Sequence, residues 1–149
     1  MRIVVQRVTE ASVRVDGKIV GKIEKGLLIF AGVAPDDDEN DIKFIADKIV
    51  NLRIFEDDNE KMNLSVKDVG GSVLVISQFT LFGDCRKGRR PNFSASCEPV
   101  KAEQIYEKLV SEVAAMDVHT EKGIFGADMK VELLNDGPVT ILLDSKKLF

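Results

Sequence analysis

The hydrophobic pattern of the chain is mostly that of β-strands. Short runs rich in Val, Ile, Leu and Phe, several alternating with polar residues, predict strands at 2–8, 11–15, 18–24, 27–33, 53–55, 73–76, 118–125, 129–133 and 139–143. Asp16-Gly17 separates two of these runs and predicts a two-residue hairpin. The chain is therefore expected to contain many short strands joined by turns.

Two segments instead repeat apolar residues at helical spacing. The first can be capped by Asp37 or Asp38, and its apolar face comprises Ile42, Ile45, Ala46, Ile49 and Leu52. The second begins at Pro99, and its apolar face comprises Ala102, Ile105, Tyr106, Leu109, Val110 and Val113. Many strands with two well-separated helices predict an α+β fold, in which a mixed or antiparallel sheet closes toward a β-barrel with the two main helices outside.

Length and composition agree with a globular protein. The 149 residues are 44% hydrophobic and 31% charged, which predicts one domain spanning 1–149. No apolar stretch approaches the roughly 20 residues that span a bilayer, and strand-like sequence starts at once, so we expect neither a membrane segment nor a signal peptide. Two cysteines make no disulfide framework, which favours a reducing, cytoplasmic location.

Polar residues interrupt the hydrophobic pattern just after the run 73–76. Ser77, Gln78 and Thr80 stand among Phe79, Leu81 and Phe82. Buried hydroxyls and amides need hydrogen-bond partners, and a strand end of this kind can direct them into a cavity. Ser77 and Thr80 would face opposite sides of a regular strand, so a shared cavity requires a bend near Gln78 and Phe79. The alternative is an ordinary strand end capped by its own hydroxyls.

A basic loop follows this strand end. Four of the five residues 86–90 are basic, namely Arg86, Lys87, Arg89 and Arg90. Such a loop suggests an anionic ligand, although a solvated surface loop is the alternative. The net charge of the chain is −4, which excludes a generic nucleic-acid binder. Any RNA contact would therefore depend on this local patch.

The chain carries few residues for conventional catalysis. His119 has no adjacent nucleophile, and Cys85 and Cys97 form neither a zinc-ligand set nor an obvious thiolate site. No phosphate-binding Gly-rich motif is present. We expect no metal and no cofactor. An enzyme of this sequence would depend on hydroxyls, on backbone groups, or on the substrate itself.

The segment Asn135-Asp-Gly-Pro-Val-Thr140 is the second unusual stretch. Gly137 tolerates backbone angles that other residues avoid, and Pro138 makes a cis peptide bond possible. Taken alone, the segment predicts a turn.

Together with Ser77-Gln-Phe-Thr-Leu81, this segment resembles the bacterial and eukaryotic type of D-aminoacyl-tRNA deacylase. The opening Met1-Arg-Ile-Val-Val-Gln-Arg-Val8 and the stretch Lys87-Gly-Arg-Arg-Pro-Asn-Phe93 are similar too, so the resemblance spans the chain. The unaltered Ser-Gln-Phe-Thr motif favours the enzymes that check chirality over related deacylases with relaxed chirality.

The resemblance implies an activity and an assembly. The expected reaction is hydrolysis of the ester that joins a D-amino acid, or glycine, to the terminal adenosine of tRNA. The expected partners are D-aminoacyl-tRNA, glycyl-tRNA and a second copy of the chain, with active sites at the homodimer interface. Gly137 and Pro138 would form a cis peptide bond that reaches into the neighbouring subunit's pocket. Their carbonyls would bind the substrate amino group and exclude L side chains.

The resemblance also implies roles for individual residues. Ser77, Gln78, Phe79 and Thr80 would line the catalytic pocket, and catalysis would rest on backbone groups and the 2′-hydroxyl of the RNA. The expected tRNA-binding residues are Arg7, Arg86, Lys87, Arg89, Arg90 and Phe93, with Arg7 near the pocket and Phe93 near the adenine. Two other functions remain open at this point. They are an esterase or amidase of small molecules with Thr80 as nucleophile, and a barrel that binds tRNA without catalysis.

Overall fold

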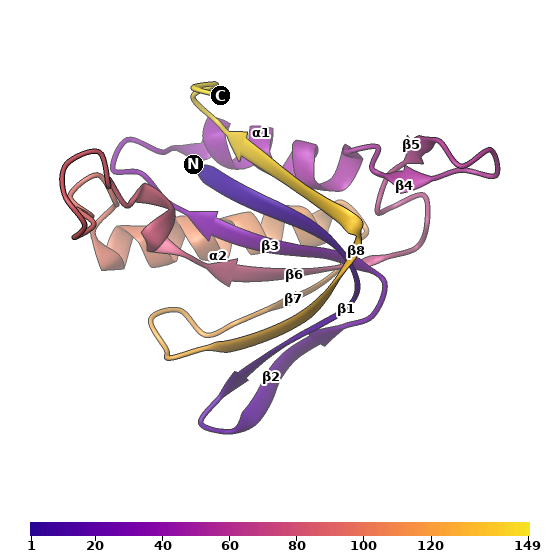
Figure 1. Ribbon diagram of the computed structural model, residues 1–149, viewed down its shortest axis with the longest axis horizontal. Helices are drawn as coiled ribbons and strands as arrows, with labels where there is room; N and C mark the ends of the chain where they lie inside the picture. The colour runs from indigo at the N-terminus through magenta and orange to yellow at the C-terminus, as the bar shows by residue number, and fades with distance from the viewer.

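A curved mixed sheet with two helices against one face makes up the structure, a computed structural model that describes residues 1–149 (Figure 1). Its strands are β1 (Arg2–Val15), β2 (Lys18–Ile23), β3 (Gly26–Gly32), β4 (Phe55–Glu56), β5 (Met62–Leu64), β6 (Ser72–Ser77), β7 (His119–Lys122) and β8 (Lys130–Asp144). The helices are α1 (Glu39–Asn51) and α2 (Pro99–Ala115), and a 3₁₀ turn, η1 (Phe79–Phe82), follows β6. Neither helix is long and apolar enough to cross a membrane.

The long strand β1 organises the sheet. It pairs antiparallel with β8 along one edge, and along the other edge with β3 first and then with β2. Strands β6 and β7 continue the sheet beyond β3 in parallel. At the far side β2 approaches β7 so closely that a Cβ added to Gly21 would lie 2.7 Å from the Lys122 carbonyl oxygen. The predicted mixed sheet that closes toward a barrel, with two helices outside, is therefore confirmed.

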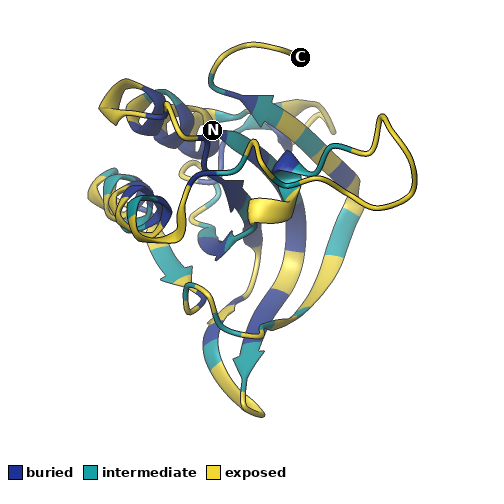
Figure 2. Ribbon diagram, turned by 90° about the vertical axis from the view of Figure 1, so that its left-hand side faces the viewer, coloured by how far each residue is buried: buried dark blue, intermediate teal, exposed yellow.

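Buried apolar residues form two clusters on the two faces of the sheet. The larger cluster joins Ile3, Val5 and Ile29 to both helices, and Figure 2 shows each helix buried on its sheet-facing side and exposed on the other. The smaller cluster includes Leu28 and Leu74 and fills the inside of the curved sheet. Alternate residues of β3 thus belong to different clusters, because successive side chains of a strand face opposite sides.

The starts of both helices follow the sequence signals. Asp38 caps α1 through a reciprocal capping box with Asp41, and Pro99 is the first residue of α2. The last two predicted strands differ from expectation, because they form one continuous strand, β8, rather than two strands joined by a turn. Both halves of β8 pair with the same strand, and the turn-forming residues are accommodated as a bulge.

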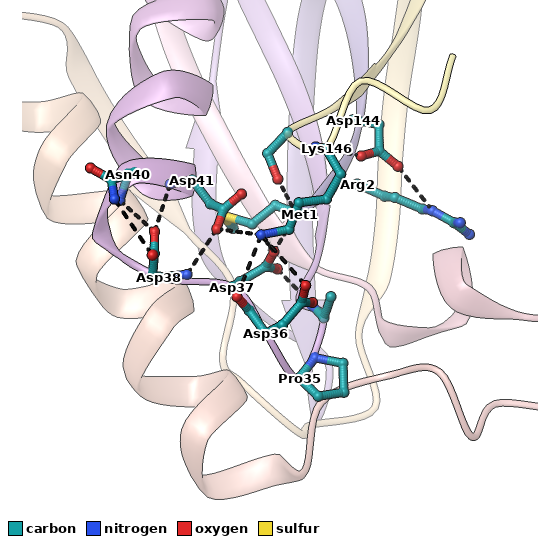
Figure 3. A network of polar contacts seen from close by, with 12 residues as sticks. Met1, Arg2, Pro35, Asp36, Asp37, Asp38, Asn40, Asp41, Asp144 and Lys146 are labelled. Carbon is teal, nitrogen blue, oxygen red and sulfur yellow. Dashed lines mark hydrogen bonds and ion pairs between the residues drawn. The ribbon is translucent and has the colours of Figure 1, made fainter.

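A polar network joins the start of β1 to α1 and to the end of β8 (Figure 3). The α-ammonium group of Met1 donates to the Ser145 hydroxyl and to the buried Asp37 carboxylate, the latter at 2.6 Å. Lys146 pairs with Asp41 at 2.9 Å. Burial raises the pKa of Asp37 despite the hydrogen bonds that it accepts from Met1 and from the Ala34 N–H. The network fixes the edge of the sheet beside which η1 lies.

Candidate active site

A cavity of about 560 Å³ opens at the end of β6. Ser77, Gln78 and Phe79 line it, as the polar strand end predicted. The rest of the wall comes from Ala31, Val33 and Ile76 of the sheet region, Ser96, Cys97, Pro99 and Ala102 at the start of α2, and Phe125, Gly126, Ala127, Asp128, Met129 and Val131 beyond β7. Ten of these 16 residues are hydrophobic, so the cavity is largely apolar, with Ser77 and Gln78 among its few polar residues.

The predicted bend occurs at Gln78. Its N–H still donates to the Ala31 carbonyl, at 2.8 Å, as a continuation of the parallel ladder between β3 and β6. The chain then turns into η1, where the Gly83 N–H donates to the Thr80 carbonyl at 2.9 Å. The Gln78 amide nitrogen donates to the Thr80 hydroxyl. Thr80 is exposed beside the cavity and is not part of its wall.

Two phenylalanines meet at the rim of the cavity. Phe79 is 57% exposed, and its ring contacts Phe93 edge-on, with 5.1 Å between ring centroids. Phe93 does not line the cavity itself. Its ring instead supports Phe79, which does line the cavity.

The basic loop is closed at its base and open at its tip. Asp84 and Asn92 exchange two backbone hydrogen bonds of 2.7 and 3.0 Å. Both Asp84 carboxylate oxygens accept from Arg86, at 2.9 and 2.7 Å, and these hydrogen bonds hold the pKa of Asp84 well below its usual range. Lys87, Arg89 and Arg90 are exposed, and no ion pair of the structure involves them. Three of the four basic side chains are therefore free to meet a ligand.

The second motif forms the bulge of β8. Asn135 is paired with Val8 and Thr140 with Gln6, so residues 136–139 stand opposite Arg7 alone. The Asn135 side-chain amide donates to the carbonyls of Arg7 and Val139, at 2.9 and 3.0 Å. This single side chain closes the bulge on both sides.

Arg7 packs against this bulge. Its Nε donates to the Asp136 carbonyl at 3.1 Å, and its Nη1 donates to the Ile54 carbonyl at 2.7 Å. Gly137 has a φ of +110°, and a Cβ at this position would overlap Nη2 of Arg7. Only glycine fits this close approach without displacing the arginine.

One expectation about this region, the cis peptide bond, is corrected by the structure. No peptide bond is cis, so the Gly137–Pro138 bond is trans, which is the isomer that X–Pro bonds favour by about 0.5–1 kcal/mol. Here the positive φ of Gly137, rather than a cis bond, redirects the chain. Arg7, expected to contact tRNA, is only 5% exposed, and its guanidinium serves Asp136 and Ile54.

The two motifs lie apart within one chain. Arg7, beside the bulge, pairs with Leu27, whereas Ser77 pairs with Ala31. Four residues along β3 separate these positions, a distance of about 13 Å at about 3.3 Å per residue. In Figure 1 the bend of β8 lies at the right, and the segment that follows β6 lies at the left. The bulge therefore does not reach the cavity of its own chain.

Sequence reasoning missed the walls contributed by Ser96, Cys97 and the segment 125–129. These are mostly small or apolar residues in a pattern that also suits a protein core, so no local signal marked them. Cys97 is 8% exposed, and its N–H donates to the Val33 carbonyl at 2.9 Å. Burial raises the pKa of its thiol, which makes it a poor nucleophile.

Comparison with known proteins relates the whole chain to one group. The sequence model of the family described as D-Tyr-tRNA(Tyr) deacylase matches residues 4–144. Proteins named D-aminoacyl-tRNA deacylase from Fervidobacterium nodosum and Koribacter versatilis are 62% and 60% identical over 149 residues, with full coverage of both chains in each case.

Two solved structures share the fold. A protein described as the c-Myc DNA unwinding element binding protein superposes with a TM-score of 0.91 at 37% identity, covering 97% of this chain and 98% of its own. A probable eukaryotic D-amino acid tRNA deacylase superposes with a TM-score of 0.80 at 16% identity, covering 95% and 97%.

Proposed function

This chain belongs to the D-Tyr-tRNA(Tyr) deacylase family, and we propose that it hydrolyses the ester bond of D-aminoacyl-tRNA to release the D-amino acid and tRNA. It is thus a hydrolase of carboxylic esters. The observation that supports the reaction most directly is the cavity at the end of β6, bordered by Ser77, Gln78 and Phe79. Because aminoacyl-tRNAs are substrates of translation, the enzyme would work in the cytoplasm.

The cavity suits the terminal adenosine of the tRNA. Its volume of about 560 Å³ lies within the range of about 300–1,000 Å³ that small-molecule sites occupy. Its walls are mostly apolar, and Phe79 and Phe125 offer aromatic surfaces for a base. An adenosine bound here would bring its esterified ribose toward Ser77 and Gln78.

The residues around Ser77 and Gln78 favour catalysis without a side-chain nucleophile. The only side-chain hydrogen bond of Thr80 joins it to Gln78, whose amide cannot act as a general base. Backbone N–H groups at the bend could polarise the ester carbonyl, as in other acyl-transfer sites. In this hydrolysis the nucleophile would be water, and the neighbouring 2′-hydroxyl of the RNA would activate it.

A second copy of the chain would complete the site. The bulge with Gly137 and Pro138 is displaced from Ser77 by about 13 Å along the strand direction, and it also lies three strands away in the sheet. It could therefore wall the cavity only of a partner. Leu134 and Leu142 of β8 are 58% and 57% exposed, which offers apolar surface for such an interface. We therefore include a homodimer in the proposal, with light scattering as its test, and an active monomer would contradict it.

The bulge would act as the chirality filter. Backbone held by Arg7 and Asn135 moves less than a side chain that changes rotamer, so it makes a firm wall against an L side chain. Its carbonyl oxygens could accept hydrogen bonds from the substrate ammonium group. Glycine, which lacks a side chain, would pass the filter. D-Aminoacyl- and glycyl-tRNA should therefore be cleaved and L-aminoacyl-tRNA spared.

A deacylation assay with D-tyrosyl-, L-tyrosyl- and glycyl-tRNA tests the function. We expect release of D-tyrosine and glycine and no detectable release of L-tyrosine. Equal cleavage of both enantiomers would refute the filter, and binding without cleavage would favour a non-catalytic tRNA-binding protein. A covalent acyl adduct on Thr80, detected by mass spectrometry with a slow substrate, would favour the small-molecule esterase instead.

The free basic side chains would contact the tRNA backbone. Each lost phosphate contact should reduce the slope of log affinity against log salt by roughly 0.7–0.9. Arg89→Glu combined with Arg90→Glu should therefore weaken tRNA binding and flatten this slope. Arg86→Ala is a useful comparison, because Arg86 is already paired with Asp84 and should contribute less. An unchanged slope in the double variant would show that the loop is only a solvated surface.

A further inference from the structure

The turn η1, which carries Phe79 and Thr80, contacts two residues of the sheet, Arg2 and Gly32. Arg2 of β1 is the register partner of Gly32 in β3 and of Asp144 in β8. The structure thus joins the start of β1 to the segment that borders the cavity.

Gly32 lets η1 pack closely against β3. A Cβ at Gly32 would lie 3.0 Å from the Gln78 carbonyl oxygen, 3.1 Å from the Phe82 ring and 3.2 Å from Cβ of Leu81. Contacts this short mean that η1 would have to shift by a few tenths of an ångström to admit a Cβ at this position. Glycine at this position therefore lets the whole turn lie directly on β3.

Arg2 holds η1 through its guanidinium group. Its Nη1 donates to the Leu81 carbonyl at 3.2 Å, and its guanidinium carbon lies 4.6 Å from the centre of the Phe82 ring. Its Nε pairs with Asp144 at 3.3 Å, which aims the guanidinium at the turn (Figure 3). One planar cation thus holds both the backbone and the buried aromatic side chain of η1.

We infer that Arg2 is a positioning residue for deacylation, which fixes η1 and so sets the placement of Gln78, Phe79 and Thr80 against the cavity. The inference rests on the proposed function, since it assumes that this segment handles the ester. A structural contribution accompanies this role. The Asp144 side chain is only 3% exposed, and without Arg2 it keeps the hydrogen bond from the Lys146 N–H, at 2.7 Å, but loses its charged partner. Removing the guanidinium should therefore lower the melting temperature as well as loosen η1, and the exchange and kcat measurements separate the two effects.

Arg14 offers a matched control for the test. It lies on the same strand, its side chain is 39% exposed, and it pairs with Glu132 of β8 at 3.9 Å without touching η1. Arg2→Ala, Arg2→Lys, Gly32→Ala and Arg14→Ala would be compared by three measurements. These are kcat and KM for D-tyrosyl-tRNA, hydrogen exchange of the peptide spanning residues 78–83, and the melting temperature.

Arg2→Ala should lower kcat by about 10–100-fold, since small misplacements of reacting groups have effects of this size, while KM stays within about twofold. Exchange at the Leu81 and Gly83 amides should rise, and Arg14→Ala should match the wild type in all three measurements. Arg2→Lys should recover part of kcat, because lysine can pair with Asp144 but lacks the planar fork. Gly32→Ala displaces η1 from the opposite side and keeps the test decisive if Arg2→Ala does not fold.

Wild-type kcat in Arg2→Ala, or a loss of kcat with unchanged exchange in 78–83, would overturn the inference. A wild-type protein that does not deacylate D-tyrosyl-tRNA would instead refute the proposed function. In that case the exchange comparison would still decide whether Arg2 holds η1.

Discussion

Arg2 and Arg7, five residues apart on β1, each hold one of the two motifs, but in opposite surroundings. Arg7 has 6% of its side chain exposed and donates hydrogen bonds to the backbone carbonyls of Ile54 and Asp136. Arg2 has 33% of its side chain exposed and reaches across the sheet edge to η1. An odd and an even position on one strand face opposite sides, so the two arginines serve different layers.

The bulge beside Arg7 is therefore a closely held stretch of backbone, whereas η1 beside Arg2 is an exposed turn supported from one side. Around Arg7 the Asp136 and Val139 carbonyls accept hydrogen bonds from side chains of the same chain, and the proposed filter uses the backbone of the bulge between them. Near Arg2 the side chains of Phe79 and Thr80 stay exposed, and Arg2 holds their turn at the Leu81 carbonyl. The configuration at Cα decides on which side the side chain lies, so a rigid wall suits the proposed selection of D substrates, whereas an exposed segment suits the proposed contact with a large RNA.

The largest expected effect is loss of stability in Arg7→Ala. The variant leaves the buried Ile54 carbonyl and the Asp136 carbonyl without their donor, which should lower the free energy of unfolding by about 2–4 kcal/mol. Urea unfolding measures this loss. Arg14→Ala, which removes an exposed ion pair from the same strand, should change it by less than about 1 kcal/mol. Equal losses in the two variants would show that burial does not distinguish these arginines.

A smaller effect is expected when Gly137 and Gly17 are each replaced by alanine. Both have positive φ, +110° and +76°, but a Cβ at Gly17 meets nothing within 4 Å, whereas at Gly137 it overlaps Arg7. Gly17→Ala should therefore cost about 1 kcal/mol of backbone strain, and Gly137→Ala about 1–2 kcal/mol more. Gly137→Ala should also impair the cleavage of D-tyrosyl-tRNA, because the bulge must shift.

A double-mutant cycle sharpens this prediction. In the Arg7→Ala background the overlap disappears, so Gly137→Ala should cost about as little as Gly17→Ala. Additive costs for Arg7→Ala and Gly137→Ala would mean that the two residues do not press against one another.

Much of the fold was predictable because its signals are local. Asp16-Gly17 marks its own hairpin, and Asp38 and Pro99 mark the starts of their helices. The bulge was not predictable in the same way. Turn residues between two strand-like runs normally join two neighbouring strands, and only the pairing of both runs with β1 makes them one strand. That pairing joins residues that are more than 110 positions apart in the sequence.

The candidate site also combines residues that have a local sequence signal with residues that have none. Polar residues within an apolar run predicted that Ser77 and Gln78 border a cavity. Phe125 and Met129 gave no such signal, because an apolar cavity wall and a protein core share one composition. The isomer of the Gly137–Pro138 bond was not predictable either, since the two isomers differ by only about 0.5–1 kcal/mol and the surroundings decide between them.

The smallest expected effect concerns pH at the Arg2 end of β1. Burial acts to raise the pKa of Asp41, but hydrogen bonds from Lys146, Ser145 and the Asp38 N–H outweigh it and lower the pKa to about 2. A carboxylate whose pKa falls on folding stabilises the protein above its unfolded pKa of about 3.9, and this contribution is lost as the pH falls toward 2. Asp41→Asn should therefore be less stable than the wild type by about 1–2 kcal/mol at pH 6, since partial exposure of Lys146 limits the gain.

That difference should shrink between pH 4 and pH 2, as followed by urea unfolding at a series of pH values. Asp128→Asn, which removes an ion pair whose two side chains are more than 70% exposed, should show little difference at any pH. The loss in Arg7→Ala should vary less with pH, because the two shortest contacts of Arg7 run to carbonyl oxygens, which do not titrate, and only its 3.4 Å ion pair with the partly exposed Asp136 carboxylate does. A difference for Asp41→Asn that stays constant from pH 6 to pH 2 would show that Asp41 acts through packing and the helix cap rather than through its charge, and the two ends of β1 would then be alike in their response to pH.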